Sequence, residues 1–460
     1  MPFRWDPYAN MSQLQAAPRE PEADMRAETK CARPSRQVAL WLWERLKEHP
    51  LARVGPGVIT GVADDDPSGI ATYSQAGAQY GLNMLWTMPL AFPLMAAVQS
   101  MCARIGRVTG KGLAANIQMV FPRYVLQIVV LLLLIANTLN IAADVAAMGE
   151  AAELVTHVDR HLMTVVFVLA TLLLQIAVPY HRYVSYLKWL TISLLAYAAV
   201  LFTVHVPWKA VALRTVMPHF VLNASAATMI VGIFGTTISP YLFFWQASEE
   251  VEDMRLKGRS SLLATESSAA LLELKRIKWD TWNGMFYSDI AAYFIILATA
   301  VTLHIAGVTD ISTAGQAASA LEPLAGRFAC FVFALGILGV GLLAVPVLAG
   351  SAGYALCEAM RWNWGLELSP KDARGFYGVI AVSVLLAVVI QYSPIPPMKA
   401  LFWSAVINGV VAVPMIVLVI LLATKRSVMG PFIAPKVLVY FGWIAALLMG
   451  LAACQMLLTA

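Results

Sequence analysis

The sequence predicts an all-α membrane protein with about eleven transmembrane helices. Hydrophobic residues make up 59% of the 460 residues, charged residues only 13%, and the mean hydropathy is +0.70. Soluble globular chains carry about 25% charged residues, so this chain has too few polar side chains to cover a water-facing surface of its size. Its apolar residues also gather into runs near the length of about 20 residues that a spanning helix needs. Lipid is therefore the expected solvent for most of the chain.

Two regions follow from the distribution of charged and apolar residues. Residues 1–50 carry many charges and no secretory signal, and we expect a largely disordered cytoplasmic tail. Residues 51–460 form the predicted transmembrane domain. The expected spans cover residues 54–80, 82–105, 124–152, 161–179, 184–206, 224–250, 284–307, 327–357, 374–392, 396–423 and 436–459.

Lysine and arginine positions set the expected orientation. With the N-terminus in the cytoplasm, 27 of the 32 Lys and Arg residues fall in inside segments. Positive residues favour the cytoplasmic side of a membrane protein. We therefore expect a multi-pass protein of the plasma (inner) membrane, with the N-terminus inside and the C-terminus outside. The net charge of +5 then belongs to the cytoplasmic membrane surface, and it gives no reason to expect nucleic-acid binding.

The first and sixth spans carry polar interruptions at mid-membrane. The first contains three consecutive aspartates, Asp64–Asp66, followed by Pro67. The sixth contains a Gly-Thr-Thr sequence at 235–237, followed by Ser239 and Pro240. Proline removes a backbone donor and clashes with the preceding turn, whereas glycine permits unwinding. Unwound backbone at this depth is tolerated where it is buried or lines a cavity, so both spans are predicted to be discontinuous helices.

The two interruptions lie five spans apart, and because five is odd, the two halves cross the membrane in opposite directions. Paired discontinuous helices in inverted repeats place a binding site at the bilayer midplane. We expect one repeat at about 54–206, a second at about 224–423 and a peripheral helix at about 436–459. Two ordinary proline kinks are the alternative interpretation, but such kinks give no structural reason for the neighbouring carboxylates.

The three adjacent aspartates indicate a cation. A carboxylate at the bilayer centre costs about 2.5–3.5 kcal/mol on insertion scales, and adjacent carboxylates also repel each other. A divalent cation relieves both costs, and the half-helix ends add free carbonyls and the negative ends of helix dipoles. The expected partners are therefore a divalent metal ion, as transported substrate, and the lipid membrane. Neither a cofactor nor an obligate protein partner is expected.

At these residues the sequence resembles the natural resistance-associated macrophage protein (Nramp) family of divalent-metal transporters. The similarity covers roughly residues 51–424, and its strongest stretches are GPGVITGVADDDPSGIATYSQAGAQYG at 55–81 and ARIGRVTGKGLAANI at 103–117. Family members typically carry Asp-Pro-Gly-Asn at the first interruption and Met-Pro-His at the sixth span. The resemblance implies a LeuT-like 5+5 inverted repeat with the metal bound between the two interruptions.

Ligand changes separate this chain from the family pattern. Asp66 retains the aspartate, but Gly69 stands where the family has a liganding asparagine, and Ser239 stands where it has the methionine. Thr236 stands where the family offers a backbone carbonyl. A thioether favours soft transition metals, whereas carboxylate, carbonyl and water favour magnesium, calcium and manganese. The chain looks like the Nramp-related magnesium transporters, which also lack the methionine, and this implies Mg²⁺ as first substrate and Mn²⁺ as second.

The proton pathway of the resembled family is incomplete in this sequence. Asp144 is kept in the third span, but Ala147 stands where a glutamate is usual and Tyr241 where a histidine is usual. The ordinary pKa of tyrosine, about 10, makes it a poor proton carrier at neutral pH. We expect weak or absent proton coupling. Asp144 and Tyr241 are the candidate residues for proton transfer or for gating of the site. A structural role for Asp144 is the alternative.

Further positions complete the candidate site. Asp65 is expected to help bind a hydrated ion and Asp289 to face the bundle interior. The resemblance further implies that Asn408 substitutes for a glutamine that contributes from the tenth span in relatives. Residues 253–283 are expected to form a charged cytoplasmic loop with one surface helix, and the acidic residues at 249–253 to form a solvated face.

Two rival functions stay open. A proton-coupled Mn²⁺/Fe²⁺ importer of the ordinary family type is favoured by Asp144 and opposed by Ala147, Ser239 and Tyr241. An intramembrane aspartic hydrolase needs two carboxylates from different helices, which Asp66 and Asp144 would supply. That chemistry requires neither the proline-linked unwinding nor the inverted repeat, so an enzyme is not the expected class.

Overall fold

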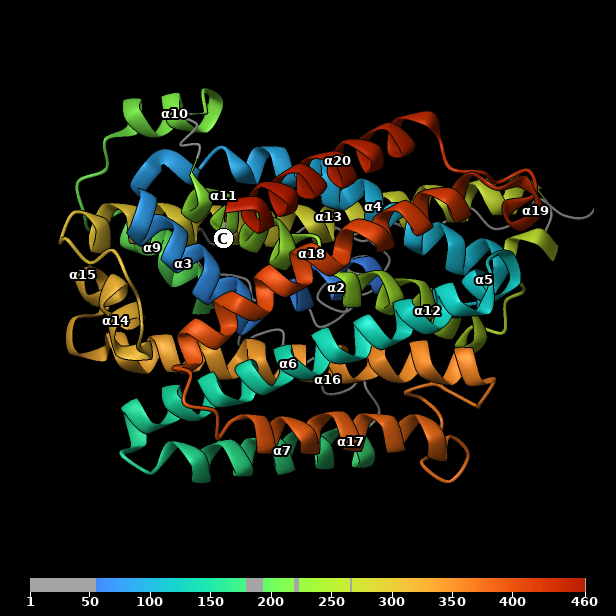
Figure 1. The fold of residues 1–460 in the computed structure, drawn as a ribbon, viewed down its shortest axis with the longest axis horizontal. Helices are drawn as coiled ribbons and strands as arrows, with labels where there is room; N and C mark the ends of the chain where they lie inside the picture. Colours follow the sequence, from blue (N-terminus) through green and yellow to red (C-terminus); the bar gives the residue numbers. More distant parts are fainter. Residues whose placement is uncertain (1–54, 179–192, 219–222, 265–266, 460) are drawn as a thin grey trace, which may run out of the picture. The chain divides into compact units, whose positions relative to one another are not determined.

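The computed structural model describes residues 55–178, 193–218, 223–264 and 267–459, and all regular secondary structure in them is helical (Figure 1). The expected tail lies outside these residues. The first helices are α2 (Pro56–Asp64), α3 (Pro67–Tyr80), α4 (Thr87–Thr109), α5 (Leu113–Val120), α6 (Arg123–Thr156), α7 (Arg160–Ala177), α9 (Leu195–Val200) and α10 (Trp208–Val216). They are followed by α11 (Ala224–Thr237), α12 (Pro240–Leu256), α13 (Ser267–Thr299), α14 (Ala314–Ala318), α15 (Glu322–Ala325), α16 (Ala329–Met360), α17 (Arg374–Ile390), α18 (Pro397–Thr424), α19 (Arg426–Met429) and α20 (Lys436–Thr459).

Eight helical segments of the described chain are long and apolar enough to cross a membrane, which makes the protein an integral, multi-pass membrane protein. Three of the eleven expected spans are not among the eight. The first span is divided into the short helices α2 and α3, and the ninth is α17, with 17 residues. The first part of the expected fifth span, 184–192, lies outside the described residues, and in the remaining part α9 covers only Leu195–Val200.

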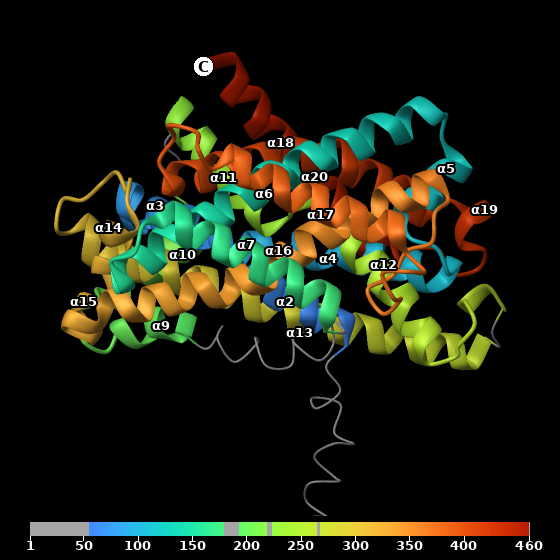
Figure 2. The same ribbon diagram turned by 90° about the horizontal axis from the view of Figure 1, so that it is seen from below.

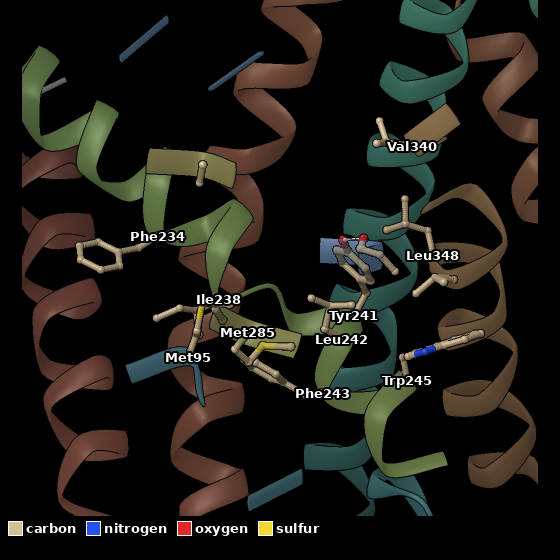
Figure 3. Close-up of a cluster of buried hydrophobic side chains, with 14 of the residues drawn as sticks. Met95, Phe234, Ile238, Tyr241, Leu242, Phe243, Trp245, Met285, Val340 and Leu348 are labelled. Atoms are coloured by element: carbon tan, nitrogen blue, oxygen red, sulfur yellow. Dashed lines mark hydrogen bonds between the residues drawn. The ribbon is translucent and has the colours of Figure 1, made fainter. Parts of the chain in front are cut away.

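Both predicted discontinuous helices are present. The first span stops at Asp64 and resumes at Pro67, and the sixth stops at Thr237 and resumes at Pro240. Proline cannot continue a helix from the preceding turn, but its fixed φ suits the first helical position. Figure 3 shows Ile238 at the interruption of the sixth span, within the buried hydrophobic core.

The helices pack so that each half of a broken span has a long helix as support. Helices α2 and α3 lie along α13, α11 along α18, and α12 along α4, and the long helices α6 and α16 also lie side by side (Figures 1 and 2). Helices α2 and α13 approach backbone to backbone, because a Cβ atom added at Gly57 would lie 2.6 Å from the backbone nitrogen of Thr281. Small residues at helix interfaces permit this approach in membrane proteins, and it fixes α2 closely on α13.

Within the expected loop at 253–283, the expected helix is present as the first part of α13, but the loop itself is shorter than expected. Helix α12 continues to Leu256, and α13 already begins at Ser267. Charges in this region are paired between helices: Arg276 on α13 contacts Glu250 on α12 at 2.9 Å. Glu250 has 0% exposure, so the expectation of a solvated acidic face is also wrong. A charged run fits inside a helical bundle when its members find partners on neighbouring helices.

Candidate functional site

The two interruptions meet in the interior. Ser68 Oγ lies 3.5 Å from Thr236 Oγ1, and Tyr73 donates or accepts a hydrogen bond with Thr237 at 3.1 Å. All four side chains are buried. The unwound segments of α2/α3 and α11/α12 therefore line one common interior site, as the sequence predicts for a discontinuous pair.

Asp66 is the carboxylate that lies at this meeting point. It is the N-cap of α3, and its Oδ1 accepts the Gly69 backbone N–H at 2.7 Å and the Ser68 hydroxyl at 2.6 Å. Its Oδ2 accepts the Asn140 amide at 3.0 Å and the Tyr241 hydroxyl at 3.4 Å. Asp66 is 1% exposed. The capping bonds hold Oδ1 in place, and Oδ2 is turned toward α6 and α12.

Gly69, Thr236 and Tyr241 share this site with Asp66. A Cβ atom added at Gly69 would lie 3.2 Å from Thr236 Oγ1 and 3.5 Å from Asp66 Oδ1. Tyr241 also donates to the Ala63 carbonyl at 3.4 Å, near the end of α2. These contacts bring four of the predicted residues together from α3, α11 and α12.

Ser239 lies at the second interruption, but its hydroxyl is turned back on α11. It donates to the Gly235 and Thr236 carbonyls at 2.9 and 2.7 Å. The Thr236 carbonyl, predicted as an ion ligand, is therefore reached by the Ser239 hydroxyl. A role for either group as a ligand stays a prediction.

Asp65 turns away from Asp66 toward α13. Ser288 on α13 donates to Asp65 Oδ1 at 3.0 Å and to Asp64 Oδ2 at 2.7 Å. The second oxygens of Asp64 and Asp65 and one oxygen of Asp289 are buried without a hydrogen-bond partner. No group of three or more His, Cys, Asp or Glu side chains is arranged to hold a metal ion within the described residues.

Helix α6 contributes two residues on one face, Asn140 and Asp144, which are four positions apart. Asp144 interacts with the Asp66 charge and the Ser68 backbone N–H, but no hydrogen bond of ordinary geometry satisfies either of its oxygens. Sequence reasoning selected Asp144 and missed Asn140, which contacts Asp66 directly. The signal was available, because a buried amide four residues before a candidate carboxylate shares its helix face.

The contribution of α18 comes from Ser404. Its hydroxyl donates to Asn140 Oδ1 at 2.7 Å, and this bond connects α18 with α6 beside Asp66. Asn408, the predicted residue, is buried one turn further along, and its Nδ2 has no hydrogen-bond partner. The hydrogen bonds of the described residues do not link Asn408 to Asp66.

A cavity of about 180 Å³ lies along the far half of α3, away from α2. It is lined by α3 residues from Ala71 to Gln79, by Asp310 and Ile311, and by the first turns of α18. Lys399 on α18 forms an ion pair with Asp310 at 3.1 Å on its wall. Because Ala71 lies about one turn beyond Asp66, the cavity leads toward the interrupted segment of the first span.

A bundle with two interrupted spans meeting at a buried carboxylate is the architecture of inverted-repeat membrane transporters. The chain belongs to the Nramp family, because the family model "Natural resistance-associated macrophage protein-like" matches residues 57–459. Members of this family are transporters and not enzymes, which excludes the aspartic-hydrolase alternative.

Curated relatives and solved structures agree with this membership. Proteins named divalent metal cation transporter MntH are 28% identical in Verminephrobacter eiseniae (76% of this chain and 80% of that protein) and 27% identical in Bradyrhizobium diazoefficiens (89% and 88%). A solved manganese transporter of Eremococcus coleocola superposes with a TM-score of 0.70 at 18% identity, covering 90% of this chain and 86% of that chain. Mhp1, a nucleobase-cation-symport-1 family transporter, superposes with a TM-score of 0.51 at 13% identity, covering 88% and 93%. These structures confirm the LeuT-like fold.

Proposed function

We propose that the protein transports divalent metal cations by alternating access, with Mg²⁺ as the preferred substrate, Mn²⁺ second, and weak or no proton coupling. The names of the curated relatives support divalent-cation transport in general. The observation that carries the proposal is the polar surrounding of Asp66, where Ser68, Thr236 and Tyr241 bring hydroxyl groups and Asn140 brings an amide to one buried carboxylate. Oxygen ligands favour magnesium and manganese over softer metals.

A partly hydrated ion suits this donor set. Magnesium usually keeps several waters and takes one or two carboxylates. Asp66 supplies one carboxylate, and Gly69 leaves room where a side chain would approach Thr236. The ion therefore binds between the two interruptions with retained waters, with Thr236 and Ser239 as further oxygen donors.

Weak coupling follows from the residues on α6 and α12. Tyr241 reaches Asp66 through a hydroxyl, and Ala147 is buried without a titratable group. A proton-coupled Mn²⁺/Fe²⁺ importer is the second candidate, and one observation favours it. Asp144 is a fully buried carboxylate close to Asp66, where a proton would influence ion binding.

The proposed route runs from the cavity beside α3 to Asp66 and then past α2 to the cytoplasm. We place the protein in the plasma membrane with its N-terminus inside, two repeats at about 54–206 and 224–423, and a peripheral helix at about 436–459. An inside-negative potential favours inward movement by about 2.3 kcal/mol per charge per 100 mV.

The test is uptake into proteoliposomes, followed with magnesium- and manganese-sensitive dyes and an internal pH dye. Asp66→Ala is compared with the parent, and Asp372→Ala removes an exposed carboxylate outside the cavity as the matched control. We expect Mg²⁺ uptake that Asp66→Ala abolishes and Asp372→Ala retains, without internal acidification. Manganese uptake with matching acidification and no magnesium signal would instead establish the proton-coupled alternative.

A further inference from the structure

The geometry points to Asn140 as a direct ligand of the transported ion, so that its amide oxygen and Asp66 Oδ2 bind the same divalent cation. The inference rests on the proposed function, because it concerns the same site. Asn140 lies on α6, has 0% exposure, and is the amide that contacts the Asp66 carboxylate.

The Asn140 side chain lies between Asp66 and Ser404. Its Nδ2 donates to Asp66 Oδ2 at 3.0 Å, and its Oδ1 accepts from Ser404 Oγ at 2.7 Å. The other oxygen of Asp66 is occupied by Ser68 and the Gly69 backbone N–H. Oδ2 is therefore the Asp66 oxygen turned toward an ion, and the Asn140 amide is beside it.

Rotating the Asn140 amide by half a turn replaces the nitrogen that donates to Asp66 with the amide oxygen, which can bind a cation. The amide carries an acceptor oxygen and a donor nitrogen, so the half-turn brings Asn140 Oδ1 next to Asp66 Oδ2 and Nδ2 next to Ser404 Oγ. Ser404 can accept the new bond, because its own hydroxyl proton is also directed at the Leu401 carbonyl, 2.7 Å away. With the ion bound, Oδ1 has the cation as its partner and Nδ2 has Ser404, so the half-turn leaves neither amide atom unsatisfied.

The spacing suits a magnesium ion. Octahedral Mg²⁺ binds oxygens at 2.0–2.1 Å, which places adjacent ligand oxygens about 2.9 Å apart. The 3.0 Å between Asp66 Oδ2 and the near end of the Asn140 amide matches that edge. Gly69 has no side chain to offer as an amide ligand, whereas Asn140 brings one to the same carboxylate from α6.

Binding of MgCl₂ and MnCl₂ to the purified full chain, measured by calorimetry, tests the inference. Asn140→Leu removes the oxygen and keeps the branched shape of the side chain, and Asn140→Asp retains an oxygen at the same place. Asn137→Leu is the matched control, because Asn137 is also a buried amide on α6 (1% exposed) but donates to Leu348 and Ser351 of α16.

We expect Asn140→Leu to raise the Kd at least about tenfold, the lower end of what losing a group at a metal site costs. Asn140→Asp should bind as tightly as the parent or more tightly, and Asn137→Leu should be unchanged. If Asn140→Asp weakens binding as much as Asn140→Leu, the amide only donates to Asp66 and the inference is wrong. The comparison of Asn140→Asp with the parent also decides the question if Asn140→Leu fails to fold.

The outcomes separate this inference from the proposed function. Equal binding by the parent and Asn140→Leu overturns the role of Asn140 and leaves divalent-cation transport intact. A parent that binds neither metal overturns both.

Discussion

Asp280 on α13 caps the first turn of α2, because its Oδ2 accepts the Gly57 backbone N–H at 2.8 Å. Its other oxygen accepts the Gly55 N–H at 3.1 Å, and Arg276 lies 3.8 Å from the same carboxylate. Helix α2 has no side-chain cap of its own at Gly55. The start of the first half-helix is therefore held by a neighbouring helix, at the end of the bundle that we expect to face the cytoplasm.

Replacing Asp280 with alanine should loosen α2. Loss of a helix cap costs about 1 kcal/mol, which corresponds to about fivefold faster local opening. Hydrogen-exchange mass spectrometry on peptides covering residues 55–64 measures this directly. Asp310→Ala, at the cavity beside α3, serves as the control and should leave that segment unchanged. Unaltered exchange in Asp280→Ala would mean that packing against α13 alone secures α2.

Asp144→Asn should stabilise the protein. Both Asp144 oxygens are buried without a hydrogen bond of ordinary geometry, and an unsatisfied buried group costs about 1–3 kcal/mol, more when charged. We expect a higher melting temperature in detergent for the metal-free protein. Asp159→Asn is the control, because Asp159 already caps α7 through His161 and Leu162 and asparagine caps equally well. A lower melting temperature for Asp144→Asn would show that the Asp144 carboxylate makes a stabilising interaction that asparagine does not replace.

Tyr241→Phe should have little effect on ion affinity. The Tyr241 hydroxyl bonds to Asp66 and to Ala63 are both 3.4 Å long, longer than the usual range for O–H···O hydrogen bonds. Their loss should cost less than about 1 kcal/mol, and the pH dependence of uptake should not change. Uptake at several external pH values tests both statements. A lost or shifted pH dependence in Tyr241→Phe would assign this hydroxyl a part in proton movement.

Ser239→Met should move selectivity toward soft metals. The Ser239 hydroxyl is bonded to the carbonyls at the end of α11, and a thioether at this position would add a ligand that favours soft transition metals. We expect Cd²⁺ to compete better with Mn²⁺ in Ser239→Met than in the parent. Ser239→Ala, which loses the hydroxyl without adding sulfur, should not gain cadmium affinity. Equal gains in both variants would trace the change to the lost hydroxyl.

Proline positions predicted the two interruptions well, because the effect of proline on a helix is local. Pro67 and Pro240 begin α3 and α12, as the sequence indicates. The pairing of the charged residues of α13 with other helices was not predictable in the same way. The charged first half of α13 is satisfied by residues of other helices, such as Arg107 on α4, which lies 3.4 Å from Glu273. A prediction from neighbouring residues in the sequence cannot include ion-pair partners that are more than a hundred residues away.

The candidate site was predicted only in part, because some of its contacts join residues that are distant in sequence. Asp66 and Thr236 were found because each lies beside a proline-marked interruption. The spacing of Asn140 from Asp144 places both on one helix face, but the contacts of Asn140 with Asp66 and Ser404 join residues distant in sequence and could not be inferred from that spacing. The orientation of Ser239 depends on carbonyls three and four residues before it, which compete with any ion for its hydroxyl.

The buried carboxylate of Asp66 between the two interruptions has a consequence for the stability of the folded protein. A cation that binds the folded chain and not the unfolded one adds stability by mass action, about 2.7 kcal/mol at a hundred times its Kd. The transported ion would then stabilise the folded state of its own transporter. Cells starved of it would hold less folded transporter, and a chelator in the purification buffer would lower the yield of intact protein.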